Sequence, residues 1–346
     1  MCLFASICVH LRFSQSSFLQ IAIDMSFVRS AAVTLSAVLI FGFAAPGYGQ
    51  SKDAGGRKKK KPAPFRWVNP LKQKLPGVSH ATFRSPSMDL DVGYCIYLPS
   101  EYSKPSASEQ RYPVVYYLHG GRPGSEIKSV RLAAHFHRHI EAESVPPMIY
   151  VFVNGGPVSH YNMPERDNAM GEDVFIKELI PHIDNTYRTI AERSGRGLEG
   201  FSQGGRGTTR IMFKHPHLFA SAAPGGAGHA TEKRISEENG RESENLVFTP
   251  GYNTYDLARQ YAGNPSPKLP ILIHVGTKGF NYENNLAYMQ FLDTLKIRYQ
   301  KLIVDGAPHS AAGIYEKSGL EIMKFHAANF GRTRPKQESV KLKFEE

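Results

Sequence analysis

The stretch Gly-Leu-Glu-Gly-Phe-Ser-Gln-Gly-Gly, at residues 197–205, decides the fold of this chain. It contains the pattern Gly-x-Ser-x-Gly with Ser202 at its centre, and residues 206–214 after it favour a helix. A strand, a sharp turn and a helix form a nucleophile elbow, in which a strained turn exposes the serine hydroxyl. Gly200 and Gly204 keep side chains out of that turn. The pattern also fits an ordinary glycine-rich loop, so the neighbouring motifs decide its interpretation.

Length and cysteine content limit the class of protein. The chain has 346 residues, which is enough for one large α/β domain with flanking segments. Cys2 and Cys8 lie at the extreme N-terminus. A mature chain that starts beyond them keeps only Cys95, so an intramolecular disulfide is excluded.

The N-terminal segment has the pattern of a secretory leader. From Met25, a short basic segment precedes an apolar run over residues 31–45 and a small-residue exit over residues 46–50. We expect residues 1–49 to be this leader, with Met25 as an alternative start, and the exported chain to begin near Gln50. The protein would then be secreted or periplasmic, without a stable membrane span after leader removal. A retained anchor is the alternative, although the run is short for a membrane span.

The formal net charge of +11 is concentrated outside the predicted folded body. Residues 50–61 carry six basic and one acidic side chain, within a flexible linker that we expect over residues 50–75. The tail over residues 331–346 carries five basic and three acidic side chains, and residues 1–49 carry two basic and one acidic, which leaves a net charge of +3 for residues 62–330. Basic residues in flexible flanks do not form a patterned nucleic-acid surface. We therefore expect no nucleic-acid partner and interpret the linker as a solvated spacer, with a polyanion tether as the alternative.

Strands and helices alternate over residues 76–330. We expect short antiparallel strands over residues 81–83 and 92–98, and apolar strands that begin near residues 112, 148, 219, 270 and 299. We expect helices over residues 126–142, 172–187, 286–297 and 313–330, and directly after Ser202. This alternation predicts an α/β fold, a mostly parallel central sheet with helices on both faces. The polar stretch over about residues 225–269 is expected to be a lid-like insertion.

Three motifs follow predicted strands, and the carboxyl ends of parallel strands are where sites form. The stretch His-Gly-Gly at residues 119–121 follows one apolar strand. The backbone N–H groups of Gly121 and of Gln203, which follows Ser202, could there donate to a developing oxyanion. His309 follows the last strand, where a general base would stand. Oxyanion loop, serine and histidine in this order favour an α/β-hydrolase fold.

Four stretches carry a resemblance to a known family. They are Tyr-Pro-Val-Val-Tyr-Tyr-Leu-His-Gly-Gly at residues 112–121, Glu-Leu-Ile-Pro-His-Ile-Asp-Asn-Thr-Tyr-Arg-Thr-Ile at 178–190, the elbow with His-Pro-His-Leu-Phe at 200–219, and Gly-Ala-Pro-His-Ser at 306–310. With them, the chain resembles the esterase D and feruloyl-esterase branch of the α/β-hydrolases, the carbohydrate esterase family 1 type. The resemblance implies ester hydrolysis through a Ser-His-acid triad and an acyl-enzyme, without a cofactor or a metal ion. Ser202 would be the nucleophile and His309 the base.

The third member of the implied triad is missing from its usual place. Relatives carry the acid after the penultimate strand in a Gly-x-x-Asp pattern, whereas residues 276–279 read Gly-Thr-Lys-Gly. Glu283 is the nearest carboxylate at the same end of the sheet. We expect it to be the acid, because its longer side chain can offset a shifted backbone. Asp305, or a site without an acid, remains the alternative.

The expected substrate contacts come from two strand ends, through His119, Gly120 and Tyr161. The leading interpretation is a secreted serine carboxylesterase that cleaves acyl or feruloyl esters of small molecules or polysaccharides. Siderophore-ester hydrolysis is the alternative within this class, and a non-catalytic carbohydrate-binding protein is the alternative outside it. The pair His135 and His139 lies one helical turn apart, but it lacks a nearby Cys or acidic partner and favours a solvated helix face over a metal site.

Overall fold

The computed structural model describes residues 65–230 and 250–331. The predicted leader, most of the predicted linker, the middle of the lid-like insertion and the basic tail lie outside the described residues. Residues 65–75, which we predicted to belong to the linker, pack on the body instead. Trp67 is buried, its Nε1 donates to Asn168 O at 3.1 Å, and Gly93 N donates to Trp67 O at 2.7 Å. Burial of the indole and these two hydrogen bonds hold the segment on the body, so the linker prediction is wrong for it.

Within the described residues, eight strands form one sheet in the order β1-β2-β4-β3-β5-β6-β7-β8. The strands are β1 Val78–Ser85, β2 Leu90–Tyr97, β3 Val114–Leu118, β4 Ile149–Val153, β5 Arg196–Phe201, β6 Ser221–Gly225, β7 Leu272–Lys278 and β8 Gln300–Pro308. Strand β2 pairs antiparallel with β1 and with β4, and the remaining neighbours pair in parallel. The predicted α/β fold with a mostly parallel sheet is confirmed.

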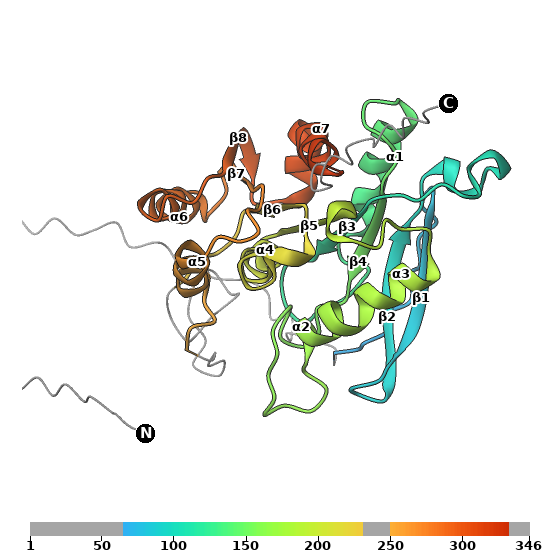
Figure 1. Ribbon diagram of the computed structural model, residues 1–346, viewed down its shortest axis with the longest axis horizontal. Helices are drawn as coiled ribbons and strands as arrows, with labels where there is room; N and C mark the ends of the chain where they lie inside the picture. Colours follow the sequence, from blue (N-terminus) through green and yellow to red (C-terminus); the bar gives the residue numbers. More distant parts are fainter. Residues whose placement is uncertain (1–64, 231–249, 332–346) are drawn as a thin grey trace, which may run out of the picture. The chain divides into compact units, whose positions relative to one another are not determined.

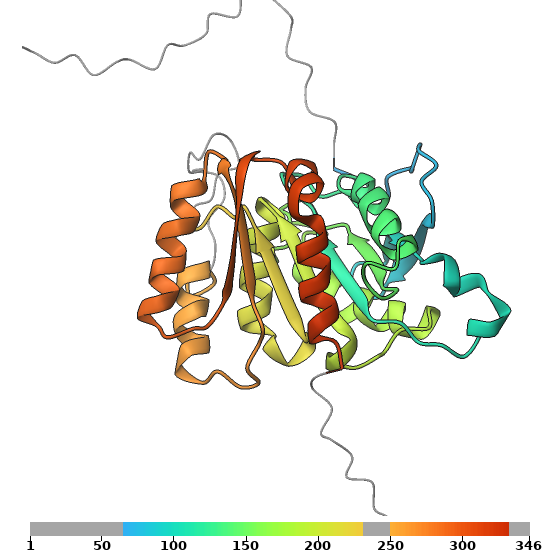
Figure 2. The ribbon, with the colours of Figure 1, turned by 90° about the horizontal axis from the view of Figure 1, so that it is seen from above.

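Helices cover both faces of the sheet. They are α1 Ala133–Glu141, α2 Gly171–Asp173, α3 Ile180–Thr186, α4 Gln203–Lys214, α5 Thr254–Gly263, α6 Tyr282–Thr294 and α7 Ala311–Asn329, and a π-helical stretch, Val174–Leu179, joins α2 to α3. In Figure 1, α1 and α7 lie above the strands, whereas α2, α4 and α5 lie below them. Figure 2 shows α1 and α7 in front of the sheet when it is seen from above. None of the helices in the described ranges is long and apolar enough to cross a membrane.

Side chains on the central strands alternate between two cores. On β3, Tyr116 and Leu118 pack in the core that includes α3, α4, α5 and α6, whereas Val115 and Tyr117 pack in the core under α1 and α7. A strand that is buried on both faces reads as a continuous apolar run. This explains why the run after Tyr112 was recognisable as a buried strand.

Several element boundaries differ from the predicted ones, three of them as follows. The helix after β7 begins at Tyr282, four residues before the predicted start, because Tyr282 N already donates to Gly279 O at 3.0 Å in a turn. Strand β8 continues to Pro308, because it pairs with β7 as far as Lys278 across a register shift. The predicted helix over residues 126–142 is shorter, since α1 covers only Ala133–Glu141. The first two differences shape the site at the carboxyl edge of the sheet.

Candidate active site

Ser202 lies at the sharp turn between β5 and α4. Its backbone angles are φ 61° and ψ −116°, a region that residues other than glycine rarely adopt. The surroundings hold this strained turn, because Ser202 N donates to Gly225 O at 2.8 Å. A Cβ atom on Gly204 would lie only 1.9 Å from Leu118 O. The glycine is therefore required by the close approach of β3 to α4.

His309 follows β8 and faces the serine. Its Nε2 lies 2.8 Å from Ser202 Oγ, although the two residues are 107 positions apart in the sequence. The imidazole lies against two aromatic rings, with centroid distances of 4.9 Å to Phe201 and 4.2 Å to Phe280. Burial lowers the pKa of His309 below its ordinary value. The ring is therefore neutral at neutral pH and can accept a proton.

The side chain of Asn281 holds the other nitrogen of this imidazole. Its Oδ1 lies 3.1 Å from His309 Nδ1, while its Nδ2 donates to Gly226 O and, at 3.1 Å, to Ala227 O. The two carbonyl groups accept hydrogen bonds only, so they assign the amide nitrogen to their side and the amide oxygen to the histidine. Nδ1 of His309 must then carry the proton, which leaves a lone pair on Nε2 for the Ser202 hydroxyl. This is the tautomer that a serine nucleophile requires.

Glu283 does not contact the histidine, and its predicted place beside Nδ1 is wrong. It is exposed in the first turn of α6, because the helix begins before it and turns its side chain outward. Asp305 is also exposed, and its Oδ1 accepts from Thr277 Oγ1 at 3.2 Å. Neither carboxylate is a hydrogen-bond partner of His309 within the described part of the chain. An asparagine stands where the sequence suggested an acid.

The predicted oxyanion loop passes directly over the serine. A Cβ atom on Gly120 would lie 3.2 Å from Ser202 Cβ. Gly120 O accepts hydrogen bonds from His119 Nδ1 at 3.1 Å and from Lys128 Nζ at 3.4 Å. In a trans peptide, the N–H of Gly121 points away from that carbonyl and hence away from both donors. The N–H of Gln203 is the first of α4, and the first N–H groups of a helix lack an intrahelical acceptor.

His119 supports this loop from behind and is not a wall of the substrate site, as we had predicted. The side chain is buried, and its Nε2 accepts from Ser125 N at 3.3 Å and Gly155 N at 3.2 Å. Nδ1 must therefore carry the proton that it donates to Gly120 O. Burial holds the pKa of His119 well below its usual value, so the ring stays neutral and keeps this acceptor.

Two residues of the loop after β4, Ser159 and His160, support the predicted oxyanion loop, a role that the sequence did not suggest for either. Ser159 Oγ donates to Gly121 O at 2.7 Å, and His160 Nε2 lies 3.1 Å from His119 O. Both residues have positive φ values, 26° for Ser159 and 65° for His160. Polar residues in a loop carry no periodic signal, so only their backbone conformation, which the sequence does not show, marks them as support for the oxyanion loop.

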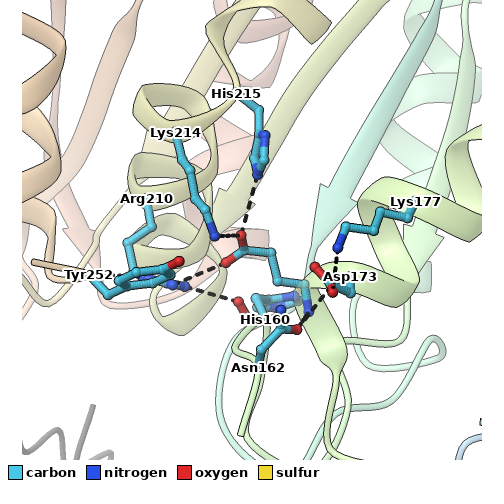
Figure 3. A network of polar contacts seen from close by, with 9 residues as sticks. His160, Asn162, Asp173, Lys177, Arg210, Lys214, His215 and Tyr252 are labelled. Carbon is cyan, nitrogen blue, oxygen red and sulfur yellow. Dashed lines mark hydrogen bonds and ion pairs between the residues drawn. The ribbon is translucent and has the colours of Figure 1, made fainter. Parts of the chain in front are cut away.

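Tyr161 is buried in a charged network and does not line a substrate cleft, which corrects its predicted role. The guanidinium of Arg210 lies 3.7 Å from the centre of its ring. Arg210 also pairs with Glu172 at 3.1 Å, and Lys214 pairs with the same carboxylate at 2.5 Å, in the network shown in Figure 3. Burial alone would raise the pKa of Glu172, but the hydrogen bond from His215 and the two cations lower it to about 2. The network anchors this loop to α4.

Metal ligands do not gather in the described ranges, 65–230 and 250–331, where no group of three His, Cys, Asp or Glu side chains could hold an ion. His135, one member of the histidine pair noted in the sequence, lies 3.0 Å from Arg138 Nη2 and 3.8 Å from Glu316 Oε2. These neighbours are those of a polar helix surface.

Comparison with known proteins adds the family. The Esterase family model matches residues 85–310. "Esterase MT1326" of Mycobacterium tuberculosis is 30% identical over 152 residues, which are 43% of this chain and 32% of the relative. An endo-1,4-beta-xylanase/feruloyl esterase of Xylanibacter ruminicola is also 30% identical over 152 residues, 41% of this chain and 20% of that protein. The chain thus spans about a third or less of the curated relatives that it matches.

A solved structure shows the same fold. A ferulic acid esterase superposes with a TM-score of 0.59 at 21% sequence identity, over 73% of this chain and 98% of the other. The family match covers more than half of the chain, and it contains the oxyanion loop, Ser202, Asn281 and His309. The strand–turn–helix geometry at Ser202 agrees with that match. This chain belongs to the esterase family and has its α/β-hydrolase fold.

Proposed function

We propose that the protein is a serine carboxylesterase whose catalytic residues are Ser202, His309 and Asn281. One observation carries the proposal, the continuous line of hydrogen bonds from Asn281 Oδ1 to His309 Nδ1 at 3.1 Å and from His309 Nε2 to Ser202 Oγ at 2.8 Å. A nucleophile, a base within hydrogen-bond reach and a group that orients the base are the parts that covalent ester cleavage requires.

The reaction follows from these positions. Ser202 Oγ attacks the ester carbonyl carbon while His309 Nε2 accepts the hydroxyl proton. The N–H groups of Gly121 and Gln203 are proposed to bind the negative oxygen of the tetrahedral intermediate. Nε2 then gives its proton to the departing alcohol, which leaves an acyl-enzyme on Ser202. A water molecule, deprotonated by the same nitrogen, releases the acid and restores the serine.

The amide of Asn281 orients the base without adding a negative charge. In a serine protease, exchanging the triad aspartate for its amide lowers turnover about 10⁴-fold, because the histidine takes the wrong tautomer. Here the carbonyl groups of Gly226 and Ala227 occupy the amide nitrogen, so the oxygen faces His309 and selects the right tautomer. A carboxylate at this position would place its second oxygen against two carbonyl oxygens. The pocket around residue 281 therefore favours an amide.

The substrate is proposed to be an acyl or feruloyl ester of a small molecule or a polysaccharide. The feruloyl esterase among the relatives supports this choice. Phe280 supports it too, because 71% of this large apolar side chain is exposed directly beside His309. An aromatic acyl group or a sugar ring can stack on such a surface. Export by the predicted leader is part of the same proposal, since polysaccharides lie outside the cell.

Turnover of p-nitrophenyl acetate and methyl ferulate by the purified chain tests the proposal. Replacing Ser202 by alanine should abolish turnover and labelling by a fluorophosphonate, with little change in the thermal midpoint, because the hydroxyl serves the chemistry and not the packing. The replacement Ser310→Ala is a suitable control, since this serine only caps α7 through Gly313 N at 3.2 Å. Equal turnover by the Ser202→Ala variant and the parent would refute the proposal.

A further inference from the structure

A fully buried carboxylate that the proposed reaction does not use lies directly beneath the nucleophile. Glu199 is on β5, three residues before Ser202, and none of it is exposed. Its Oε1 accepts from Tyr315 Oη at 2.6 Å, and its Oε2 lies 3.6 Å from His326 Nε2. Both partners belong to α7, the helix that follows His309. A buried carboxylate is costly unless it is paired, so a specific use is expected.

The negative charge of this carboxylate also reaches a histidine on the strand that leads to Asn281. His274 is buried on β7, seven residues before Asn281. Burial lowers the pKa of His274 to about 4, whereas the negative charge of Glu199 raises it. The two side chains therefore interact electrostatically. His326 extends the network to β6, where Ser221 Oγ lies 2.7 Å from its Nδ1.

Two segments that carry catalytic residues therefore meet at Glu199, because strand β5 leads to Ser202 and its partners lie on α7, which follows His309. The set Ser221, His326 and Glu199 has the composition of a second nucleophile, base and acid. All three side chains have an exposure of 0%, so substrate and water cannot reach them. The network can therefore affect the reaction only by positioning other groups.

We propose that Glu199 is a positioning residue that sets the alignment of the serine and histidine segments. The inference rests on the proposed function. Apolar packing between a helix and a sheet carries little directional information, whereas hydrogen bonds in a buried, low-dielectric network are strong and directional. A misplacement of about 1 Å at reacting groups can cost on the order of 100-fold in rate. Anchoring α7 on the elbow strand thus protects the 2.8 Å contact between His309 and Ser202.

Two replacements of Glu199 test this role. Glu199→Met removes every polar contact at similar volume, and we expect kcat for p-nitrophenyl acetate to fall about 10- to 100-fold with KM within about twofold of the parent. Glu199→Gln keeps an oxygen that can accept from Tyr315, so it should recover most of that loss. A residue with a purely structural role would change the thermal midpoint of both variants without this split between kcat and KM.

The matched control is at the opposite end of the same strand. Asp184 pairs with Arg196, the first residue of β5, at 2.5 Å and is largely buried. Asp184→Asn should lower the thermal midpoint and leave kcat at the parental value. The inference is overturned if Glu199→Met keeps the parental kcat, or if Asp184→Asn loses kcat to the same extent.

Two measurements keep the result unambiguous. Should Glu199→Met fail to fold, Tyr315→Phe removes a single hydroxyl, and it should still lower kcat several-fold; a parental kcat in that variant contradicts the inference. Turnover by the parent and its loss in Ser202→Ala are measured first. Absence of parental turnover contradicts the proposed function, whereas an active parent with an equally active Glu199→Met contradicts only the role of Glu199.

Discussion

The orientation of one imidazole ring depends on one amide group. Asn281 is largely buried, and its Nδ2 is held by two carbonyl oxygens while its Oδ1 holds His309. The amide oxygen orients the ring as a carboxylate would, but it adds no charge that stabilises the imidazolium. Consequently, the pKa of His309 reflects its burial, which lowers it. The orientation of the ring by Asn281 and the lowered pKa of His309 each lead to a prediction.

Replacing Asn281 by alanine should lower kcat about 100-fold or more, because the ring loses its only side-chain partner at Nδ1 in the described part of the chain. KM should change little, since the amide does not face the substrate. Asn284 in the first turn of α6 is the control, because within residues 65–230 and 250–331 its side-chain hydrogen bonds go to His229, at 2.7 and 2.9 Å. Steady-state kinetics decide between the outcomes. A parental kcat in Asn281→Ala, or a large loss in Glu283→Gln, would contradict this assignment.

The pH dependence of kcat/KM should report the lowered pKa of His309. The base is active when neutral, and a lowered pKa keeps it neutral in more acidic solution, so activity should persist as the pH falls through 6.5. Gly279→Asp should move the acidic limb of the pH profile, the pH range in which activity is lost on acidification, to higher pH. A Cβ atom there would lie 3.8 Å from His309 Cα and 3.4 Å from Asn281 Oδ1, so the new carboxylate would favour the imidazolium. Glu283→Gln, the control, should leave the limb in place.

At the scale of elements, the loop after β3 is held in place by two of its own side chains and by one from the loop after β4. His119, Lys128 and Ser159 bind the carbonyl groups of Gly120 and Gly121, which orients the peptide units between them. Preorganised donors stabilise a developing oxyanion because they need not turn when the charge appears. In the proposed reaction, the loop therefore acts through side chains that do not touch the substrate.

Replacing His119 by alanine should lower kcat about 10²- to 10³-fold, the loss typical of a misplaced oxyanion donor. It should also cost about 1–3 kcal/mol of stability, because Ser125 N and Gly155 N lose their acceptor. His182→Ala is the control. That histidine on α3 contacts Tyr94 Oη at 3.0 Å, and its loss should affect the thermal midpoint and not kcat. Unchanged kcat in His119→Ala would exclude this supporting role.

For the whole molecule, the boundary of the folded body lies before Trp67 and not near residue 76. A chain that begins at residue 50 should keep its activity and thermal midpoint. A chain that begins at residue 76 should be clearly less stable, because the carboxylate of Glu126 loses Asn69 N at 2.6 Å and Asn69 Nδ2 at 2.9 Å, and a buried indole is removed. Thermal unfolding of the two purified chains gives the answer. Equal midpoints would mean that residues 65–75 behave as the predicted linker.

The sequence alone was sufficient for the architecture and for the two residues at the centre of the site. Continuous apolar runs marked the strands buried on both faces, and the glycines around Ser202 marked a turn where backbones approach closely. His309 was identifiable because it directly follows the last strand. These signals are local, and parallel strands bring their carboxyl ends to one edge whatever the loops contain.

Only the tertiary structure decided which polar group faces each functional atom. Asn281 lies beside His309 and Glu283 does not, because α6 starts four residues earlier than predicted and the turn at residues 279–282 depends on contacts with the residues that follow β6 and β8 as well as on local propensity. His119 and Tyr161 follow strand ends, as sites do, but packing against His160 and Arg210 directs both side chains inward. Periodicity specifies which elements form, whereas the direction of a loop side chain depends on partners that are distant in the sequence.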